Sequence, residues 1–328
     1  MHSTINKIWY QNHWLKWILF PLSCLFWLLS NIRKTLFTIG LKKQHKLPVP
    51  VIVVGNITAG GSGKTPMVIH LIELLKNHGY QPGVISRGYG ANVDGVRTVS
   101  LKHTPEQVGD EPAMIKARTQ VPMVVGSKRV QAAKQLLDEH DVDIIISDDG
   151  LQHYALNRDI EIAIIDGERR LGNGLMIPAG PLRELSSRLK SVDFTVVNGI
   201  KQKNSEFEML LKPSLPVLVN GKEQSFERDQ PVIAMAGIGN PQRFFNTLKK
   251  LNYKIDKQVE FADHQVFSDQ ELTKLSTELP LMMTEKDAIK CRSFSQDNWW
   301  YLPVTAQLDN AFNKKLLEKI QLATSKGH

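Results

Sequence analysis

The sequence has too few cysteines for a disulfide framework or a zinc site. Its 328 residues include only Cys24 and Cys291, which lie far apart and lack metal-type spacing. Internal repeats and low-complexity segments are also missing from the sequence. A reducing compartment fits this composition, and a hydrophobic content of 42% is enough for one large α/β domain or two lobes.

Acidic side chains are absent from the first 50 residues. This segment carries a charge of +7, whereas the whole chain carries +8, so the remaining 278 residues are close to neutral. Its basic residues are Lys7, Lys16, Arg33, Lys34, Lys42, Lys43 and Lys46. A nucleic-acid-binding protein would more often spread positive charge over its folded domain, so we expect no nucleic-acid partner.

The same segment lacks an apolar run of typical membrane-spanning length. Residues 17–29 are thirteen mostly apolar residues, whereas crossing a bilayer takes ~20. No small-residue cleavage site follows Leu29, which argues against a signal peptide. Binding at the membrane surface fits better, because basic residues and four tryptophans lie in or near the run, at Trp9, Trp14, Trp17 and Trp27. A helix packed on the protein's own core and a single spanning or signal-anchor helix are the alternatives.

Glycine, in contrast, is concentrated in one stretch after a buried strand. Residues 51–66 read VIVVGNITAGGSGKTP, which predicts a strand, a glycine-rich turn and the start of a helix. Gly60, Gly61 and Gly63 would let backbone N–H groups surround an anion, and the helix adds the positive end of its dipole. Lys64 would then reach the β- and γ-phosphates of ATP, and the Thr65 hydroxyl would bind Mg²⁺.

This phosphate loop departs from two standard patterns. Thr58 replaces the first glycine of G-x-x-x-x-G-K-[ST], and Ala59 occupies the position of the signature lysine of membrane-partitioning ATPases. The missing lysine argues against a dimer in which that lysine acts in trans, so we expect a monomer. The predicted nucleotide-binding residues are Thr58, Ala59, Gly60, Gly61, Ser62, Gly63, Lys64 and Thr65. A glycine-rich turn that binds nothing is the alternative interpretation.

A second strand ends in paired carboxylates. Residues 142–149 read VDIIISDD, which predicts a buried strand that presents an acid to the Mg²⁺ held by Thr65. Two aspartates at the end of an apolar strand are costly unless a cation or hydrogen-bond donors compensate them. Either Asp148 or Asp149 could contact the metal directly.

The remaining motifs complete a two-lobed α/β pattern. A strand at 83–86 runs into Arg87-Gly-Tyr-Gly90, where doubly wound sheets bind ligands. Gly109-Asp-Glu-Pro112 opens a helix, where acidic residues alone could simply favour the helix dipole. We therefore expect a membrane-associated helical segment at 1–48, a P-loop core with a mostly parallel sheet at 49–200, and a smaller α/β lobe at 201–328.

Together these motifs resemble the tetraacyldisaccharide 4′-kinases of lipid A biosynthesis. The likeness covers nearly the whole chain and rests on VGNITAGGSGKTP (54–66), SRGYG (86–90), GDEP (109–112), SDDGLQH (147–153), PAGPLRE (178–184), Asp263-His264 and TEKD (284–287). The resemblance implies an ATP- and Mg²⁺-dependent kinase that phosphorylates the 4′-hydroxyl of a tetraacylated glucosamine disaccharide 1-phosphate. It also implies a place on the cytoplasmic face of the Gram-negative inner membrane.

The resemblance further implies roles for individual residues. Asp110 would be the catalytic base assisted by His264, and Lys64 would act on the phosphates. The metal neighbourhood would comprise Thr65, Glu111, Asp148 and Asp149. Contacts to the acceptor headgroup or its phosphate would come from Arg87, Tyr89, Arg129, Gln152 and Arg183. Without the resemblance, the residues support a membrane-associated P-loop protein, and a nucleotide switch or partitioning ATPase is the alternative.

Overall fold

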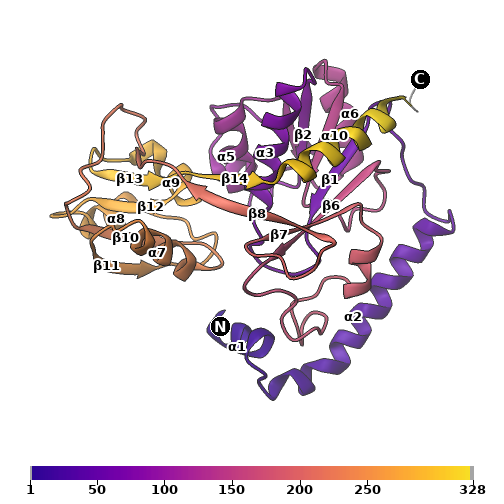
Figure 1. The fold of residues 1–328 in the computed structure, drawn as a ribbon, viewed down its shortest axis with the longest axis horizontal. Coiled ribbons are helices and arrows are strands. Elements are labelled where there is room, and N and C mark those ends of the chain that lie inside the picture. Colours follow the sequence, from indigo (N-terminus) through magenta and orange to yellow (C-terminus); the bar gives the residue numbers. More distant parts are fainter. Residues whose placement is uncertain (1, 326–328) are drawn as a thin grey trace.

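The computed structural model describes residues 2–325 as two α/β lobes and a pair of N-terminal helices. Figure 1 shows the large lobe carrying the N- and C-terminal parts of the chain, and the small lobe attached to one side of it. The N-terminal helices lie along another side of the large lobe (Figure 1).

The large lobe is built on a nine-stranded sheet with the order β14-β8-β7-β6-β1-β5-β2-β4-β3. Its strands are β1 (Val51–Gly55), β2 (Pro82–Ser86), β3 (Val96–Thr98), β4 (Met123–Gly126), β5 (Ile144–Asp148), β6 (Ile160–Asp166), β7 (Phe194–Asn198), β8 (Glu206–Pro213) and β14 (Val304–Leu308). The edge strands β3 and β14 run antiparallel to their neighbours, and the inner pairings are parallel. The predicted mostly parallel sheet is therefore confirmed.

Helices cover both faces of this sheet because its central strands are apolar on both sides. In β1, Ile52 and Val54 contribute to one hydrophobic cluster, and Val51 and Val53 contribute to the other. The first face is covered by α3 (Lys64–Asn77), α5 (Asp110–Thr119) and α10 (Asn310–Ser325), and the second by α6 (Arg129–Glu139). Two short helices, α4 (Pro105–Val108) and η1 (Ser186–Lys190), lie in connections.

The small lobe has a five-stranded sheet with the order β11-β10-β12-β13-β9. Its strands are β9 (Val217–Leu218), β10 (Val232–Ala236), β11 (Ile255–Glu260), β12 (Leu281–Thr284) and β13 (Trp299–Leu302). One face packs against α7 (Pro241–Lys250), and the other packs against α8 (Asp269–Leu275) and α9 (Glu285–Cys291), which η2 (Arg292–Phe294) follows. The second α/β lobe predicted from the sequence is present.

The predicted lobe boundary at residue 201 is wrong. β8 pairs in parallel with β7, and β14 pairs antiparallel with β8, so both strands complete the large sheet. The helix α10 also packs on that sheet through Phe312, Leu316 and Ile320. The small lobe is therefore residues 217–302, inserted between β8 and β14 (Figure 1). Local sequence predicts a strand near 207 but does not reveal which sheet the strand joins.

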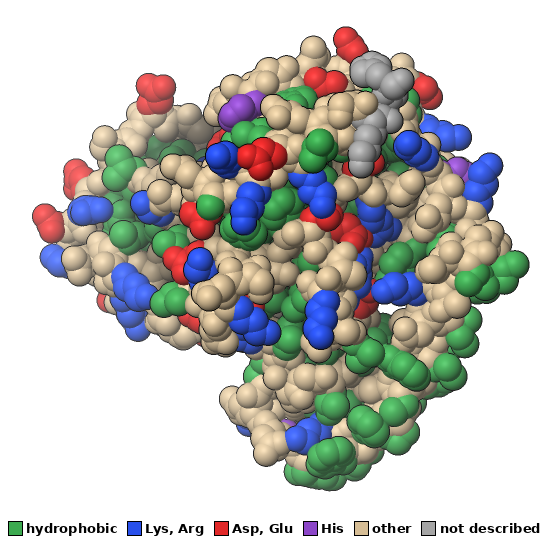
Figure 2. All heavy atoms as spheres, turned by 45° about the vertical axis from the view of Figure 1, so that its right-hand side comes forward, with side chains coloured by type: hydrophobic (Ala, Val, Ile, Leu, Met, Phe, Trp, Pro, Cys, Tyr) green, Lys and Arg blue, Asp and Glu red, His purple; other side chains and the backbone are tan. Residues whose placement is uncertain are grey.

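The N-terminal segment forms α1 (His2–Tyr10) and α2 (Leu15–Thr38). α2 has 24 residues and is long and apolar enough to cross a membrane, although the apolar run at 17–29 is short. Only 6% of its most apolar window is buried, so the interpretation as a helix packed in the core is wrong. Figure 2 shows apolar side chains gathered on the projecting part of the molecule that these helices form, and the exposed residues include Trp14, Trp17, Ile18, Leu22, Leu25, Trp27 and Leu29.

Candidate active site

The phosphate-loop sequence folds into a turn between β1 and α3. Gly60 and Gly63 have φ angles of 100° and 95°, a conformation that favours glycine. A side chain at Gly63 would also collide with Asn198, because an added Cβ atom would lie 2.4 Å from Asn198 Nδ2. α3 begins at Lys64, directly after Gly63, so the free N–H groups of its first turn lie at the end of the loop. This is the backbone arrangement that binds phosphate groups at helix N-termini.

Thr58 and Ala59, which depart from the standard patterns, pair with residues 181 and 182 of the large lobe. Thr58 forms an antiparallel β-bridge with Leu182, and the Ala59 N–H donates to Pro181 O at 2.7 Å. Thr58 does not adopt a positive φ, so this position does not require glycine. The missing first glycine therefore leaves the shape of the loop from Gly60 to Gly63 intact.

Lys64 and Asp149 lie where the phosphate loop meets the end of β5. Lys64 Nζ is 3.6 Å from Asp149 Oδ1, and Arg183 Nη1 donates to both Asp149 carboxylate oxygens at 3.2 Å. Burial alone would raise the pKa of Asp149, but the charges of Lys64 and Arg183 hold that pKa below its ordinary value. Asp149 is therefore ionised and holds two cations beside the phosphate loop.

The preceding residue, Asp148, is buried, and its pKa shifts in the opposite direction. Ser86 Oγ donates to its Oδ2 at 3.1 Å, whereas its Oδ1 has no hydrogen-bond partner within residues 2–325. Burial, together with the negative charges of Glu111 and Asp149, raises the pKa of Asp148 to about 7. A cation beside Oδ1 would compensate this buried carboxylate. The unpartnered Oδ1 of Asp148 therefore fits a cation such as Mg²⁺, and the part of Thr65 in holding it stays a prediction.

No cluster of three or more His, Cys, Asp or Glu side chains suited to a metal occurs in residues 2–325. Mg²⁺ in kinases is held by one or two carboxylates together with substrate phosphates and water, so the sparse protein ligand set agrees with such an ion. Glu111 lies 3.9 Å from Lys286 Nζ, and its role near the metal stays a prediction.

Asp110 and His264 come from different lobes and meet in a hydrogen bond. Asp110 is the first residue of α5, and His264 lies in the small-lobe segment between β11 and α8. His264 Nδ1 and Asp110 Oδ2 are 3.0 Å apart. Burial would raise the pKa of Asp110, but the hydrogen bond with His264 and the charges of Lys290 and Lys286 hold it below the ordinary value. The carboxylate is therefore ionised at neutral pH.

Lys286 in α9 lies on the other side of the His264 ring. Its Nζ is 3.3 Å from His264 Nε2 and 3.2 Å from Asp263 Oδ1. Burial would lower the pKa of Lys286, but the negative charges of Glu111 and Asp263 raise it above its ordinary value, so Lys286 is an ammonium group. Because an ammonium only donates, Nε2 accepts and the ring proton is on Nδ1, facing Asp110. The tautomer of His264 is thus set by its two neighbours.

Gly239 lies between the phosphate loop and Asp263, the residue that precedes His264. A Cβ atom added at Gly239 would lie 3.3 Å from Asp263 Oδ2 and 3.6 Å from the Gly61 nitrogen. From the large lobe, Arg169 Nη2 donates to Gly239 O at 2.9 Å. The phosphate loop and the Asp263-His264 segment therefore face one another across the junction of the two lobes.

Comparisons with known proteins identify the family of this chain. The family model described as tetraacyldisaccharide-1-P 4′-kinase matches residues 15–321. A tetraacyldisaccharide 4′-kinase of Shewanella frigidimarina is 62% identical over 322 residues, which cover 98% of this chain and 96% of the relative. The chain belongs to the tetraacyldisaccharide 4′-kinase family.

Other members of the family support the assignment. A tetraacyldisaccharide 4′-kinase of Shewanella piezotolerans is 59% identical over 324 residues, which cover 98% of both chains. The crystal structure of LpxK from Aquifex aeolicus in complex with ATP has a TM-score of 0.81 and 30% identity, with coverage of 94% of this chain and 99% of that chain. The fold of the family therefore extends over both lobes of this chain.

Three of the five predicted acceptor contacts are placed at or near the site. Arg87 and Tyr89 are exposed, and the Tyr89 ring packs edge-on against the His264 ring at 5.1 Å between centroids. Arg183 is bound to Asp149. Their contact with the acceptor stays a prediction for this member of the family.

Arg129 does not have the accessibility that an acceptor contact needs. Its side chain is buried, and its guanidinium donates to Gly126 O at 2.8 Å and to Asp148 O at 3.2 Å. Burial lowers the pKa of Arg129 to about 10 in spite of the nearby Asp148. We correct the prediction: Arg129 supports the ends of β4 and β5 from inside the protein.

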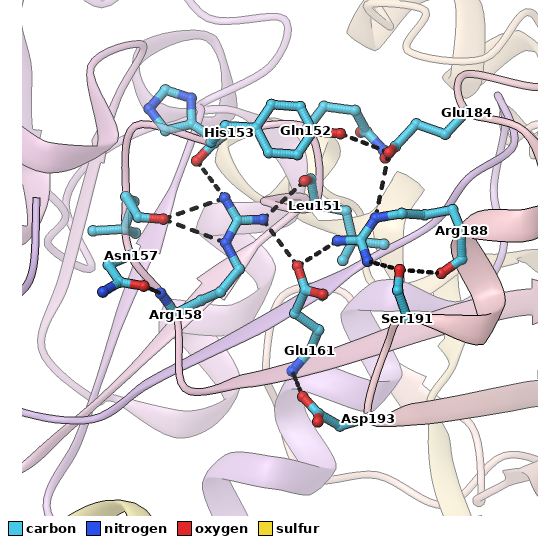
Figure 3. Close-up of polar contacts among 12 residues, drawn as sticks. Leu151, Gln152, His153, Asn157, Arg158, Glu161, Glu184, Arg188, Ser191 and Asp193 are labelled. Carbon is cyan, nitrogen blue, oxygen red and sulfur yellow. Dashed lines mark hydrogen bonds and ion pairs between the residues drawn. The ribbon is translucent and has the colours of Figure 1, made fainter. Parts of the chain in front are cut away.

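Gln152 also has a structural position. Its Nε2 donates to Asn56 O at 3.2 Å, at the start of the phosphate loop, and to Glu184 Oε1 at 2.6 Å. Figure 3 shows that Glu184 then contacts Arg188, which together with Arg158 binds Glu161. This network occupies the Nε2 group of the half-buried Gln152, so we correct its predicted role from acceptor contact to support of the phosphate loop.

Two residues of the site were not given roles by the sequence. Lys286 lies within TEKD, but only the structure places its ammonium against His264. Asn198 ends β7, and its Nδ2 donates to Ser62 O in the phosphate loop at 3.1 Å. A polar residue at the carboxyl end of a buried parallel strand was the signal that could have identified Asn198.

Proposed function

We propose that this chain is an ATP-dependent kinase of lipid A biosynthesis. It transfers the γ-phosphoryl group of ATP to the 4′-hydroxyl of a tetraacylated glucosamine disaccharide 1-phosphate. The observation that carries the proposal is the hydrogen bond between Asp110 of the large lobe and His264 of the small lobe, at the junction where the Asp263-His264 segment faces the phosphate loop. The sequence relatives and the ATP complex of the structural neighbour support the same activity.

In this proposal Asp110 is the base. A sugar hydroxyl must lose its proton as the γ-phosphoryl group is transferred, and a positioned carboxylate accepts it. His264 donates its Nδ1 proton to Asp110 Oδ2, which orients the carboxylate, and Lys286 fixes the ring from the other side. Asp110 accepts the substrate proton with its remaining oxygen lone pairs.

The phosphate loop and Lys64 would hold the β- and γ-phosphates. Thr65 and Asp148 would hold Mg²⁺, which when bound supplies charge neutralisation for the phosphates. Since phosphoryl transfer depends mainly on positioning and electrostatics, the cations Lys64 and Arg183 beside Asp149 favour negative charge at this place.

The N-terminal helices would attach the enzyme to its substrate's membrane. The acceptor carries acyl chains that remain in the bilayer, and α2 exposes tryptophans and aliphatic residues over most of its length. The basic residues of the segment favour anionic headgroups. We place the enzyme on the cytoplasmic face of the inner membrane, where ATP is available.

Phosphoryl transfer from γ-labelled ATP to the detergent-solubilised disaccharide 1-phosphate tests this function. Wild type is compared with Lys64→Ala and with the control Lys76→Ala, which removes a lysine from the exposed end of the same helix. Label should appear on the lipid with wild type and Lys76→Ala and be lost with Lys64→Ala. ATP hydrolysis without labelled lipid would instead favour a switch ATPase.

A further inference from the structure

The apolar helix α2 has one buried residue, and that residue is a serine. The Ser23 hydroxyl donates to Met176 O at 2.8 Å and accepts from the Ala179 N–H at 2.9 Å. Both donor and acceptor capacity of the hydroxyl are thus used on the segment 172–183 of the large lobe. Membrane attachment alone would not require a polar contact of this kind, because lipid favours apolar side chains.

The end of α1 binds the same segment. Asn173 Nδ2 donates to Ile8 O at 3.0 Å, and the Asn173 N–H donates to Trp9 O at 2.8 Å. Trp9 Nε1 donates in return to Pro178 O at 2.9 Å. Two carbonyl groups of the last turn of α1, those of Ile8 and Trp9, are therefore satisfied by segment 172–183.

The other end of segment 172–183 pairs with the phosphate loop. Pro181 O accepts from the Ala59 N–H at 2.7 Å, and the Arg183 N–H donates to Ile57 O at 2.7 Å. These bonds flank the β-bridge between Thr58 and Leu182. Within the segment, a Cβ atom added at Gly180 would lie 2.2 Å from Asn173 Oδ1, so the turn has no room to rearrange.

A second set of contacts connects α2 with the phosphate loop. The Phe37 ring, near the end of α2, packs against Tyr154 at 6.2 Å between centroids. Tyr154 Oη donates to Glu184 Oε2 at 2.6 Å, and Glu184 also accepts from Gln152 Nε2 (Figure 3). Gln152 Nε2 donates in addition to Asn56 O. The contacts of Ser23 and Phe37 therefore both lead to residues 56–59.

We propose that Ser23 and Asn173 are positioning residues for the ATP phosphate loop, through segment 172–183. The N-terminal helices then have two roles: their exposed face meets the membrane, and their inner face holds the loop in its phosphate-binding shape. The inference rests on the proposed function, in that the phosphate loop is taken as the ATP site. It predicts that loss of the contacts of Ser23 and Asn173 changes the KM for ATP more than it changes membrane binding.

The test is a kinetic comparison of full-length Ser23→Ala and Asn173→Asp with wild type. Asn173→Asp keeps the acceptor for the Leu175 N–H but loses the donations to Ile8 O and Ala179 O. Each variant leaves buried backbone groups without a partner, so we expect the KM for ATP to rise roughly tenfold. The KM for the lipid and flotation with phosphatidylglycerol-containing vesicles should stay at the wild-type values.

Ser30→Ala is the matched control, because it removes a half-buried hydroxyl about two turns further along α2. It should leave the KM for ATP unchanged. An unchanged KM for ATP in Ser23→Ala and Asn173→Asp would overturn the proposal, even if their melting temperatures fell. Lys64→Ala distinguishes a failure of this proposal from a failure of the proposed function. Wild-type ATP affinity in Lys64→Ala would mean that the phosphate loop is not the ATP site.

Discussion

At the scale of residues, Asp110 is distinguished by its partners. Acidic residues in the first turn of a helix commonly serve only the helix dipole, and the sequence alone left that interpretation open. Here Asp110 is hydrogen-bonded to His264 from the other lobe, and His264 is in turn fixed by Lys286. A residue that merely caps α5 would not need this second pair of side chains.

Replacing Asp110 with asparagine should remove the base and keep the shape of the site. We expect kcat to fall by about 10²–10⁴-fold, the usual contribution of a positioned base, with an unchanged KM for ATP. Steady-state kinetics with the lipid acceptor measures both values. Asp141→Asn, on an exposed residue, is the control, and wild-type turnover in Asp110→Asn would exclude Asp110 from the mechanism.

His153 gives a pH-dependent prediction. Burial, with the charges of Arg129 and Arg33, lowers the pKa of His153 to about 4. His153 therefore becomes protonated near pH 6.5 in the unfolded chain but only near pH 4 in the folded chain. As the pH falls from 6.5 to 4, this residue lowers the free energy of unfolding. We expect this loss of unfolding free energy to reach roughly 1–3 kcal/mol near pH 4, because the side chain is partly exposed.

The measurement is the free energy of unfolding of wild type and His153→Gln between pH 7 and pH 4. As the pH falls, the free energy of unfolding should decrease more for wild type than for His153→Gln. Parallel pH profiles would contradict the lowered pKa.

At the scale of elements, α2 has an exposed face and a docked face with different chemistry. Trp17 and Trp27 are 64% and 41% exposed, whereas Ser23 is buried against segment 172–183. Removing the whole helix would disturb both faces at once. Substitutions on one face separate membrane attachment from support of the phosphate loop.

The double variant Trp17→Ala, Trp27→Ala should weaken membrane binding. Interfacial tryptophans contribute through apolar area and their affinity for the headgroup region, so flotation with anionic vesicles should fall several-fold. Leu322→Ala is the control, because Leu322 is 63% exposed but lies on α10. Equal flotation of the double variant and wild type would show that this face does not bind the membrane.

The sequence predicted the type of this element better than its length. The apolar run ends at Leu29, but the helix continues through Asn31, Arg33 and Lys34 to Thr38. Basic residues at the end of an apolar helix can extend their charged groups towards water, so the helix does not need to end with the apolar run. A count of apolar residues therefore underestimated α2 and its capacity to span a bilayer.

At the scale of the whole molecule, the two lobes are joined by ionic contacts close to the site. Arg118 in α5 donates to Glu285 Oε2 at 2.7 Å, to Val304 O at 3.1 Å and to Thr305 Oγ1 at 2.9 Å. Glu285 directly precedes Lys286, which holds His264. The orientation of the small lobe therefore affects the hydrogen bond between Asp110 and His264.

Arg118→Met should destabilise this junction. It leaves the largely buried Glu285 carboxylate without its partner, which costs about 1–3 kcal/mol of unfolding free energy. Lys222→Met removes a fully solvated ion pair with Asp297 and should cost less than ~1 kcal/mol. Chemical denaturation compares the two variants, and equal losses would contradict the role assigned to Arg118.

The sequence predicted the site motifs because they end strands or begin helices, where local pattern is informative. The phosphate loop and the Asp148-Asp149 pair followed from such patterns, whereas the Asp110–His264 pair was implied only by the resemblance to the kinase family. The roles of Arg129 and Gln152 and the pairing of β8 with β14 did not, because burial and strand partners depend on residues distant in the chain. The charge on Arg129 suggested a substrate contact, whereas three-dimensional packing gives it buried carbonyl partners.

The most direct test of the account is the location of the transferred phosphate. Wild-type enzyme is incubated with ATP and the tetraacylated disaccharide 1-phosphate, and the product is fragmented in a mass spectrometer. The account predicts one added phosphate on the 4′-hydroxyl, with far less product from Asp110→Asn. Phosphate at another hydroxyl, or ATP consumption with the lipid unchanged, would contradict it.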